Sequence, residues 1–353
     1  MDTKSQCIIG EDDLVLVTGA GGFIGSRVVA ALLELGFRRI RCLLRSSSGK
    51  GRDLPFTKGP VGTGLEIVSG NLLSREDCEK AVKDVAVVFH LAAARGEKSF
   101  PDALLNSVVT TRNLLEACAH QPHFTRFVNV SSFAVYTNTD AHHGLLDESC
   151  TTEKFPHQRG DAYTFAKARQ EEIVAEYGRT HRLPYVILRP GYVYGPGNPS
   201  LSGRVGVDTF GIYLHFGGSN RIPLSYVDNC ADAIVLAGLV RGIEGEIFNV
   251  VDDNLVSSRE LLRQYKRNVK KMKSVYCPHF MSYALCWLWE KYSSWSEAQI
   301  PPVFNRKRWH AEWKKTQYTN AKLKRLLGWT QRVSTSEGLR RYFQSCREGA
   351  VRA

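Results

Sequence analysis

Tyr163 and Lys167 stand four positions apart in the string Tyr-Thr-Phe-Ala-Lys. On a helix this spacing places both side chains on one face, one turn from each other. A neighbouring ammonium favours the phenolate and lowers the pKa of a tyrosine from its unperturbed value of about 10, so the pair can transfer protons near neutral pH. Because such spacing is also common in surface pairs, the hypothesis depends on what accompanies it.

Two serine hydroxyls provide that context. The apolar segment from Phe127 to Val130 predicts a buried strand, and Ser131 and Ser132 follow it directly. In open parallel sheets, ligands bind beyond the carboxyl ends of the strands. We therefore predict that Ser132 joins Tyr163 and Lys167 in a catalytic set.

A glycine-rich turn precedes these residues, with Gly19, Gly22 and Gly25 in the string TGAGGFIG. It lies between a predicted strand at 14–18 and a predicted helix at 23–35. Glycines let backbone amides approach a pyrophosphate, and the helix N-terminus adds its partial positive charge. The turn therefore predicts a dinucleotide site, although the glycine pattern alone is also compatible with a plain tight turn.

The end of the next predicted strand, 40–44, bears on the choice of cofactor. Arg45 and the serines at 46–48 follow it, and no acidic residue is present to bind a ribose 2′-hydroxyl. Arginine binds phosphate through two parallel hydrogen bonds, so NADP is favoured and NAD is the alternative. The competing interpretation of Arg45 is a solvated surface charge.

Strands alternate with helices as far as about residue 190, which predicts an α/β fold with a Rossmann-type, doubly wound parallel sheet. Further strands are expected at 65–68, 85–91, 185–188 and 248–250, and helices at 75–82, 106–118, 163–177 and 230–239. We predict a dinucleotide-binding domain at 12–195 that also receives parts of 222–250, a mainly substrate-binding lobe at 196–345, and flexible termini at 1–11 and 346–353.

With these strings the chain resembles the extended short-chain dehydrogenases/reductases of the NAD-dependent epimerase/dehydratase superfamily. The supporting motifs are TGAGGFIG, GNLL from Gly70, HLAA from His90, NSVVTTRNLLEA from Asn106, SSFAVY, YTFAK, LRPGYVYGPG from Leu188 and LGW from Leu327. The resemblance covers essentially the whole chain, and such a set in this order is highly specific.

The resemblance implies a role for each catalytic residue. Tyr163 would be the general acid and base, Lys167 would lower its pKa and hold the nicotinamide ribose, and Ser132 would hydrogen-bond the reacting oxygen. The cofactor contacts that it implies, in addition to Gly19, Gly22, Gly25, Arg45, Tyr163 and Lys167, are Phe23, Ile24, Asn71, Leu72, Leu91, Ala92, Ala93, Pro190 and Val193. Asn71 departs from the family's usual Asp. His90 is expected to pack, and Asn106 to open a helix.

The substrate class is inferred from positions at which this chain differs from the residues that are usual in branches of the family. Tyr192 stands where nucleotide-sugar members generally have Asn, and the string Tyr-Val-Asp-Asn at 226–229 resembles the 3β-hydroxysteroid dehydrogenase branch, while Arg45 resembles the dihydroflavonol reductase branch. Dehydratases place an Asp-Glu pair after the active-site hydroxyl, whereas Phe133 and Ala134 follow Ser132 here.

We therefore predict hydride transfer between nicotinamide and a secondary alcohol or ketone of a small, nonpolar, sterol-like or aryl-ketone-like substrate, with Ser131, Phe133 and Tyr192 lining its site. A nucleotide-sugar epimerase that acts by transient oxidation is the alternative. A non-catalytic, dinucleotide-sensing regulator is a third hypothesis, which the intact catalytic set disfavours.

Composition and charge limit the classes of partner that the sequence predicts. The chain has 353 residues and a formal net charge of +12, which suits an anionic ligand or surface, but it carries no nucleic-acid-binding motif. Its nine cysteines lack metal-ligand spacing, so reduced thiols and no metal are expected. No secretory signal is evident, which favours a cytoplasmic protein. The resemblance suggests a homodimer through the helices at Asn106 and Tyr163.

Residues 263–295 join a basic stretch to an apolar one that is too short to span a bilayer. Phe280, Tyr283, Ala284, Trp287 and Leu288 would share one helical face. An interfacial helix giving peripheral membrane contact is one hypothesis. A substrate-lobe helix with a solvated basic neighbour is the favoured one.

Overall fold

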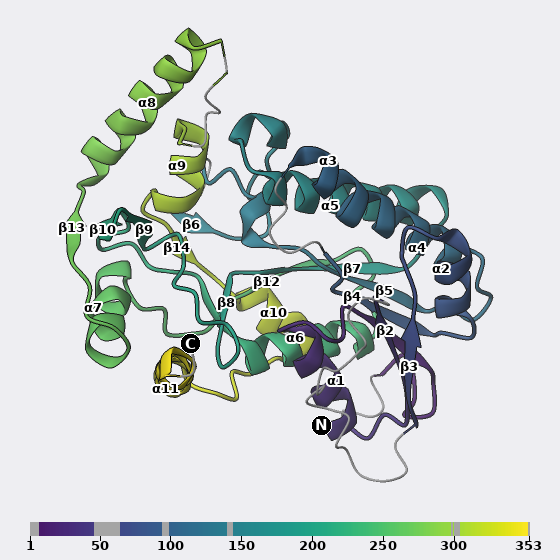
Figure 1. The fold of residues 1–353 in the computed structure, drawn as a ribbon. Helices are drawn as coiled ribbons and strands as arrows, with labels where there is room; N and C mark the ends of the chain where they lie inside the picture. Colours follow the sequence, from purple (N-terminus) through teal and green to yellow (C-terminus); the bar gives the residue numbers. More distant parts are fainter. Residues whose placement is uncertain are drawn as a thin grey trace.

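The computed structural model describes residues 7–45, 64–93, 99–139, 144–297, 299 and 304–351. A seven-stranded parallel sheet forms its centre, in the order β12-β7-β5-β4-β1-β2-β3 (Figure 1). The strands are β1 (Val15–Thr18), β2 (Arg39–Leu44), β3 (Gly64–Ser69), β4 (Val87–His90), β5 (Arg126–Val130), β7 (Tyr185–Pro190) and β12 (Ile247–Val250). The predicted fold class is confirmed.

Helices cover both faces of this sheet, which is why its central strands are continuous apolar runs rather than alternating ones. One face packs on α1 (Gly25–Glu34), α6 (Val227–Leu239) and α10 (Ala321–Leu327). The other packs on α2 (Arg75–Val82), α4 (Thr110–Ala119) and α5 (Ala162–Thr180). Because the strand order reverses between β1 and β4, a crevice opens at the carboxyl ends of these two strands.

The helix expected to start at Asn106 begins earlier. It runs from α3 (Phe100–Ala103) through a π-helical turn, η3 (Leu104–Val109), into α4. Ser99 caps its N-terminus, because the Ser99 side chain accepts a hydrogen bond from the Asp102 backbone N–H at 3.3 Å. Asn106 therefore lies inside the π-turn and caps nothing, so that prediction is wrong.

The remaining elements form smaller layers beside the main sheet (Figure 1). They are β6 (Leu145–Leu146) paired with β14 (Gln317–Tyr318), β8 (Tyr192–Tyr194) paired with β11 (Leu224–Tyr226), and the sheet of β9 (Gly206–Thr209), β10 (Ile212–His215) and β13 (Ser274–Tyr276). The helices are η4 (Phe133–Val135), η5 (Pro156–Arg159), α7 (Ser258–Asn268), α8 (His279–Trp295), α9 (Arg306–Trp313) and α11 (Thr335–Val351). The domain boundaries stay a prediction.

The described parts of the termini, which were expected to be flexible, make contacts with the rest of the fold, and their flexibility stays a prediction. Cys7 forms a β-bridge with Val240, and the Ile8 backbone N–H donates to the Leu239 carbonyl at 2.8 Å. At the other end, Cys346 is buried within α11. No helix in the described ranges is long and apolar enough to cross a bilayer.

Candidate active site

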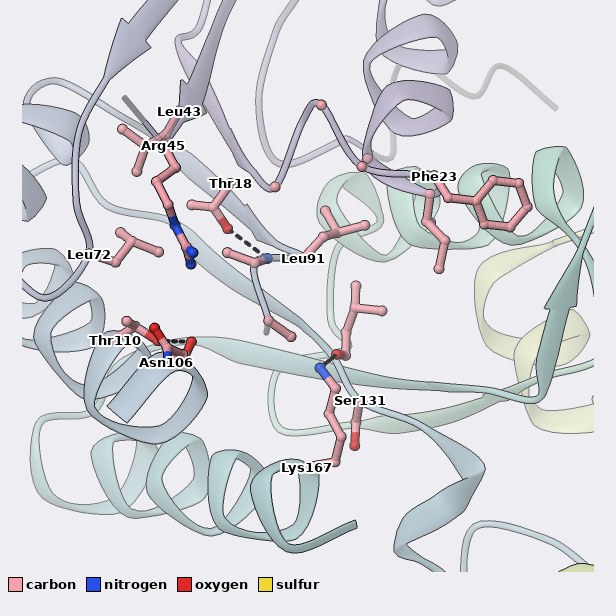
Figure 2. A pocket seen from close by; sticks show the side chains of 18 of the residues that line it. Thr18, Phe23, Leu43, Arg45, Leu72, Leu91, Asn106, Thr110, Ser131 and Lys167 are labelled. Atoms are coloured by element: carbon pink, nitrogen blue, oxygen red, sulfur yellow. Dashed lines mark hydrogen bonds between the residues drawn. The ribbon is translucent and has the colours of Figure 1, made fainter. Parts of the chain in front are cut away.

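A cavity of about 850 Å³ occupies the crevice at the carboxyl ends of β1 and β4 (Figure 2). All fifteen predicted cofactor-binding residues line it: Gly19, Gly22, Phe23, Ile24, Gly25, Arg45, Asn71, Leu72, Leu91, Ala92, Ala93, Tyr163, Lys167, Pro190 and Val193. Ser131 and Ser132 line it as well. The structure thus gathers residues from six different strand ends around one space.

The glycine-rich turn packs so closely against its own backbone and that of the neighbouring strand end that it leaves no room for a side chain at Gly19 or Gly25. A Cβ on Gly25 would lie 2.1 Å from the Gly19 carbonyl oxygen, and one on Gly19 would lie 2.9 Å from the Ala92 backbone nitrogen. Gly19 also has a φ of +71°, in the region that favours glycine. The first turn of α1 contains no acidic residue, so its positive end faces the cavity uncompensated within that turn.

A buried hydrogen-bond network below the turn joins β1, β4 and the helix of η3 and α4. The His90 Nδ1 and Nε2 atoms lie 2.8 Å from the Thr18 Oγ1 and 2.9 Å from the Thr111 Oγ1. Thr111 donates its own hydroxyl hydrogen to the Ser107 carbonyl at 2.6 Å, so His90 Nε2 must be the donor toward it. His90 is therefore neutral and accepts from Thr18 at Nδ1.

Burial is the main cause that lowers the pKa of His90 to about 3, and the nearby Lys167 ammonium adds to it. The Thr18 hydroxyl oxygen also accepts from the Ala92 backbone N–H at 3.2 Å, while Gln170 of α5 donates to Thr111 at 2.8 Å. The network therefore fixes the ends of β1 and β4 relative to α5, which is consistent with the predicted packing role of His90.

The catalytic candidates come from two elements that meet over β5. Asp161 caps α5 by accepting from the Thr164 N–H at 2.6 Å, and this places Tyr163 in the first turn with 44% of its surface exposed. One turn on, Lys167 is buried and its Nζ donates to the Val130 carbonyl at 2.8 Å (Figure 2). The lysine is thereby held at the carboxyl end of β5.

Ser132 follows β5 in an extended conformation and caps η4. Its Oγ accepts from the Ala134 N–H at 3.1 Å, a bond that does not use the hydroxyl hydrogen. That hydrogen can be donated to a substrate oxygen. The Oγ of the buried neighbour Ser131 has no hydrogen-bond partner among the described residues and lies on the cavity wall. It is a second polar group suited to a bound ligand.

Arg45 lies at the far end of the cavity from Lys167. Figure 2 shows its guanidinium extending from the end of β2 into the cavity, opposite Asn106 and Thr110. Asn71 lines the same end, where its Oδ1 accepts from the Leu73 N–H at 3.1 Å and its own N–H donates to Asp77 at 2.8 Å. The serines at 46–48 lie outside the described residues.

Phe133 and Tyr192 do not belong to the described wall of the cavity. The Phe133 ring is buried, with its centroid 5.5 Å from those of Tyr136 and Tyr318. The Tyr192 hydroxyl donates to the Ser200 carbonyl. Their role in lining a substrate site stays a prediction.

Several wall residues were not predicted from the sequence, although the structure brings them to the same cavity. They are Thr18, Gly21, Leu43, Leu44, Gly70, Asp102, Asn106, Thr110, Val130 and Gly191. Most stand directly beside residues that were predicted, so adjacency was a usable signal. Asp102, Asn106 and Thr110 are different, because they reach the wall only through the π-turn.

Comparison with known proteins settles the family. The model of the NAD dependent epimerase/dehydratase family matches residues 15–250, from the start of β1 to the end of β12. The chain belongs to this family. This match confirms the predicted family, with its extended short-chain dehydrogenase/reductase character, and confirms that the protein is an enzyme. Its cofactor is a nicotinamide dinucleotide.

Individual relatives of this family member are more distant. An uncharacterized protein of Sinorhizobium fredii is 28% identical over 70% of both chains. The 3beta-hydroxysteroid-dehydrogenase/decarboxylase isoform 2 of Arabidopsis thaliana is 26% identical over 66% of this chain but only 42% of its own length. The UDP-glucuronic acid 4-epimerase of Bacillus cereus, crystallised with UDP-glucuronic acid and NAD, has a similar fold, with a TM-score of 0.70, 22% identity, and 95% and 99% of the two chains covered.

Proposed function

We propose that this protein transfers a hydride between a nicotinamide cofactor and a secondary alcohol or ketone of a small nonpolar molecule. The observation that carries the proposal is that Ser132, Tyr163 and Lys167 line one cavity with the glycine-rich turn. The cavity fits a dinucleotide, because the glycine-rich turn has room only for glycine at Gly19 and Gly25, and because the Ser131 hydroxyl on the wall has no partner within the described part of the chain.

The chain's own residues would hold the substrate oxygen and move one proton. When bound, the nicotinamide supplies or accepts the hydride. In the reductive direction Tyr163 would give its hydroxyl proton to the carbonyl oxygen as the carbonyl carbon receives the hydride, and Ser132 would donate a hydrogen bond to that oxygen. Tyr163 would then regain its proton from solvent.

Lys167 supports this proton transfer electrostatically. Its ammonium is anchored to the Val130 carbonyl one helical turn from Tyr163, where a positive charge favours the phenolate. Lys167 also lines the cavity, so its ammonium can donate a hydrogen bond to a ribose hydroxyl of the bound cofactor.

The proposal of a nonpolar substrate rests on Tyr192. A nucleotide sugar needs hydrogen-bond donors for its phosphates, and the hydroxyl hydrogen of Tyr192 is already donated to the Ser200 carbonyl. Phe133 and Ala134, which follow the catalytic serine, carry no group that can transfer a proton. Neither can supply the acid or base that an elimination requires, so dehydration is not proposed.

We further propose NADP as the preferred cofactor, because Arg45 extends into the cavity at the end opposite Lys167. A guanidinium there can pair with a ribose 2′-phosphate.

A homodimer through the helices at Asn106 and Tyr163 also stays a proposal.

The test is a substrate screen with the full chain. Sterols and UDP-sugars are incubated with NADP+ or NAD+, and aryl ketones with NADPH or NADH, and each reaction is followed by cofactor absorbance, with Tyr163→Phe as the matched inactive control. We expect cofactor turnover with a sterol or aryl ketone that the control lacks. If neither nonpolar class is turned over while a UDP-sugar is, the proposed substrate class is wrong.

The second candidate is a nucleotide-sugar epimerase, favoured by the fold shared with the Bacillus cereus UDP-glucuronic acid 4-epimerase. The same serine, tyrosine and lysine would serve, since epimerisation requires only oxidation followed by re-reduction from the other face. It consumes no cofactor overall, so chromatography of the UDP-sugar products would reveal it where absorbance shows no change.

A further inference from the structure

Helix α8 exposes most of its large apolar side chains to solvent, while two of its serines are buried. A surface helix normally turns its apolar stripe toward the core. Here Ser282, Cys286 and Ser293 are buried, while Phe280 and Trp295 are 75% and 78% exposed. The exposed apolar set on α8 comprises Phe280, Met281, Leu285, Trp287, Leu288, Tyr292 and Trp295. In Figure 1 the helix projects beyond the body of the molecule at the upper left.

Specific contacts hold α8 in this orientation. The Trp309 indole N–H of α9 donates to the Ser282 hydroxyl at 2.8 Å. Glu290 accepts from the Arg306 backbone N–H at 2.6 Å and from its guanidinium at 2.7 Å. Tyr283, which was expected on the same face as Phe280, instead packs edge-on against Trp309 with centroids 5.1 Å apart. Rotating α8 to bury its apolar face would break these contacts.

The segment leading into α8 is basic. No Asp or Glu occurs between Glu260 and Glu290. Arg263 pairs with Glu260 at 3.0 Å, and the further exposed cations are Arg267, Lys270, Lys271 and Lys273. They lie at the end of α7 and before β13, which Figure 1 shows beside α8 along one edge of the molecule.

A second apolar element lies beside these cations. The tip of the β9–β10 hairpin exposes Phe210 and Ile212, and the Tyr213 N–H donates to the Lys273 carbonyl at 2.9 Å. The edge strand β13 exposes Val275 and Tyr276. The α8 edge, defined as α7, β13, α8 and this hairpin tip, thus combines exposed aromatic and aliphatic side chains with an excess of positive charge.

We propose that the α8 edge binds the surface of a membrane that contains anionic lipids. Apolar and aromatic side chains beside lysine and arginine are the combination that an interfacial helix uses, with the apolar face entering the boundary between headgroups and acyl chains and the cations attracting anionic headgroups. A second copy of this chain suits the edge less well, because each copy carries a net charge of +12 and would bring the same cations to the contact.

The experiment is vesicle flotation with the full chain at low and at physiological salt. Vesicles of phosphatidylcholine alone are compared with vesicles in which part of it is replaced by phosphatidylserine. We expect flotation with the anionic vesicles, reduced by salt. In Leu285→Glu/Leu288→Glu the partition coefficient should fall about tenfold or more, since two exposed leucines lose their burial in the membrane. The control Leu35→Glu changes an equally exposed leucine at the end of α1.

Charge is tested separately from the apolar face. Lys270→Glu/Lys271→Glu should lower binding to anionic vesicles about tenfold or more, because each lysine contributes about fivefold near such a surface and the reversal adds repulsion. Lys83→Glu/Arg179→Glu makes the same change of charge on the opposite part of the molecule and should have little effect. Equal losses in the two charge variants would show adsorption by net charge alone and would overturn the proposal.

Two further outcomes would overturn it. If the parent protein stays in solution with both kinds of vesicle, no lipid surface occupies the edge, and an acidic protein becomes the alternative partner. If the parent is a dimer by light scattering and Leu285→Glu/Leu288→Glu makes it monomeric without vesicle binding, a second copy covers α8. As a depth-sensitive readout, brominated phosphatidylcholine should quench the tryptophan fluorescence of the parent more than that of Trp287→Phe/Trp295→Phe.

Discussion

The buried network below the glycine-rich turn and the α8 edge are opposite arrangements of polar and apolar groups. In the buried network, His90 and Thr111 are polar, buried and hydrogen-bonded to each other, whereas α8 exposes Phe280 and Trp295. Each arrangement costs free energy in an isolated chain unless something compensates for it. In the buried network the hydrogen bonds themselves compensate. At α8 the proposed membrane surface would do so, and the family match, which ends at residue 250, does not include this helix.

The two regions should respond differently to substitution. Substitutions at the cavity should change chemistry and cofactor binding without changing attachment to vesicles. Substitutions at the α8 edge should do the reverse.

The largest expected effect is on turnover in Tyr163→Phe. The variant removes only the proton-carrying oxygen, and general acid–base catalysis typically contributes about 10²- to 10⁴-fold. We expect a loss of kcat in that range, with cofactor affinity by fluorescence titration and vesicle flotation both unchanged. Full activity in this variant would refute the proposed acid and base.

Lys167→Ala should affect two properties together. The ammonium is proposed to favour the phenolate and to bind the ribose, so we expect turnover to fall by about a hundredfold and cofactor affinity by about tenfold, since a hydrogen bond to a charged group contributes about 1.5 to 3 kcal/mol. Thermal unfolding serves as the control, because the Nζ also donates to the buried Val130 carbonyl. An effect on turnover alone would remove the ribose role.

Arg45→Ala tests the other end of the cavity. Losing a charge-assisted bond to the 2′-phosphate should weaken NADPH binding by about ten- to hundredfold and leave NADH binding nearly unchanged. The measurement is the ratio of the two dissociation constants in parent and variant. An unchanged ratio would show that Arg45 is a solvated charge and that the cofactor preference has another origin.

The smallest effect concerns acid stability. The pKa of His90 is lowered to about 3, so the folded state binds fewer protons than the unfolded state between that value and the ordinary value near 6.5. Stability present above pH 6.5 is therefore lost as the pH falls through this window, by at most about 1.4 kcal/mol per pH unit. His90→Gln should remove this dependence in urea unfolding between pH 7 and pH 5.

His215 provides the matched control for that experiment, because burial is also the main cause that lowers its pKa, to about 4, and it lies next to α7 rather than at the cavity. His215→Gln should reduce the acid dependence in the same direction. Only His90→Gln should also change cofactor affinity. Equal effects on the cofactor in both variants would contradict the assigned place of His90 below the cavity.

Local signals in the sequence predicted much of the sheet and its helices. The helix expected at 75–82 has those bounds, because Ser74 caps it by accepting from the Asp77 N–H at 3.2 Å. The helix through Asn106 was misplaced, although Ser99 and the following proline at 101 carry the signal for its true start. Sequence spacing assumes α-helical periodicity and cannot show a π-turn.

The site was predictable where chemistry depends on residue type at a strand end, and less so where it depends on packing between distant segments. Ser132 and Arg45 were predicted because each lies within two residues of the carboxyl end of a strand. The orientation of α8 was not predictable, because the pattern shows which residues share a face but not which face Trp309 of α9 will cover. The small sheets around β8 and β10 were also missed, since their strands are very short.

The π-turn at 104–109 has a consequence for changes in chain length. A π-turn contains one residue more than the α-helical turn it replaces, and here the Thr110 hydroxyl bonds to the Asn106 carbonyl at 3.0 Å and helps to satisfy the loosened backbone. Deleting the exposed Leu105 would remove this extra residue and let the segment close into a regular α-helix, with α3 and α4 keeping nearly the same relative orientation. Asp102 and Thr110, which flank the turn, would then both keep their places on the cavity wall. This face of the cofactor cavity should therefore tolerate a single-codon deletion in the turn, which an unbroken α-helix would not.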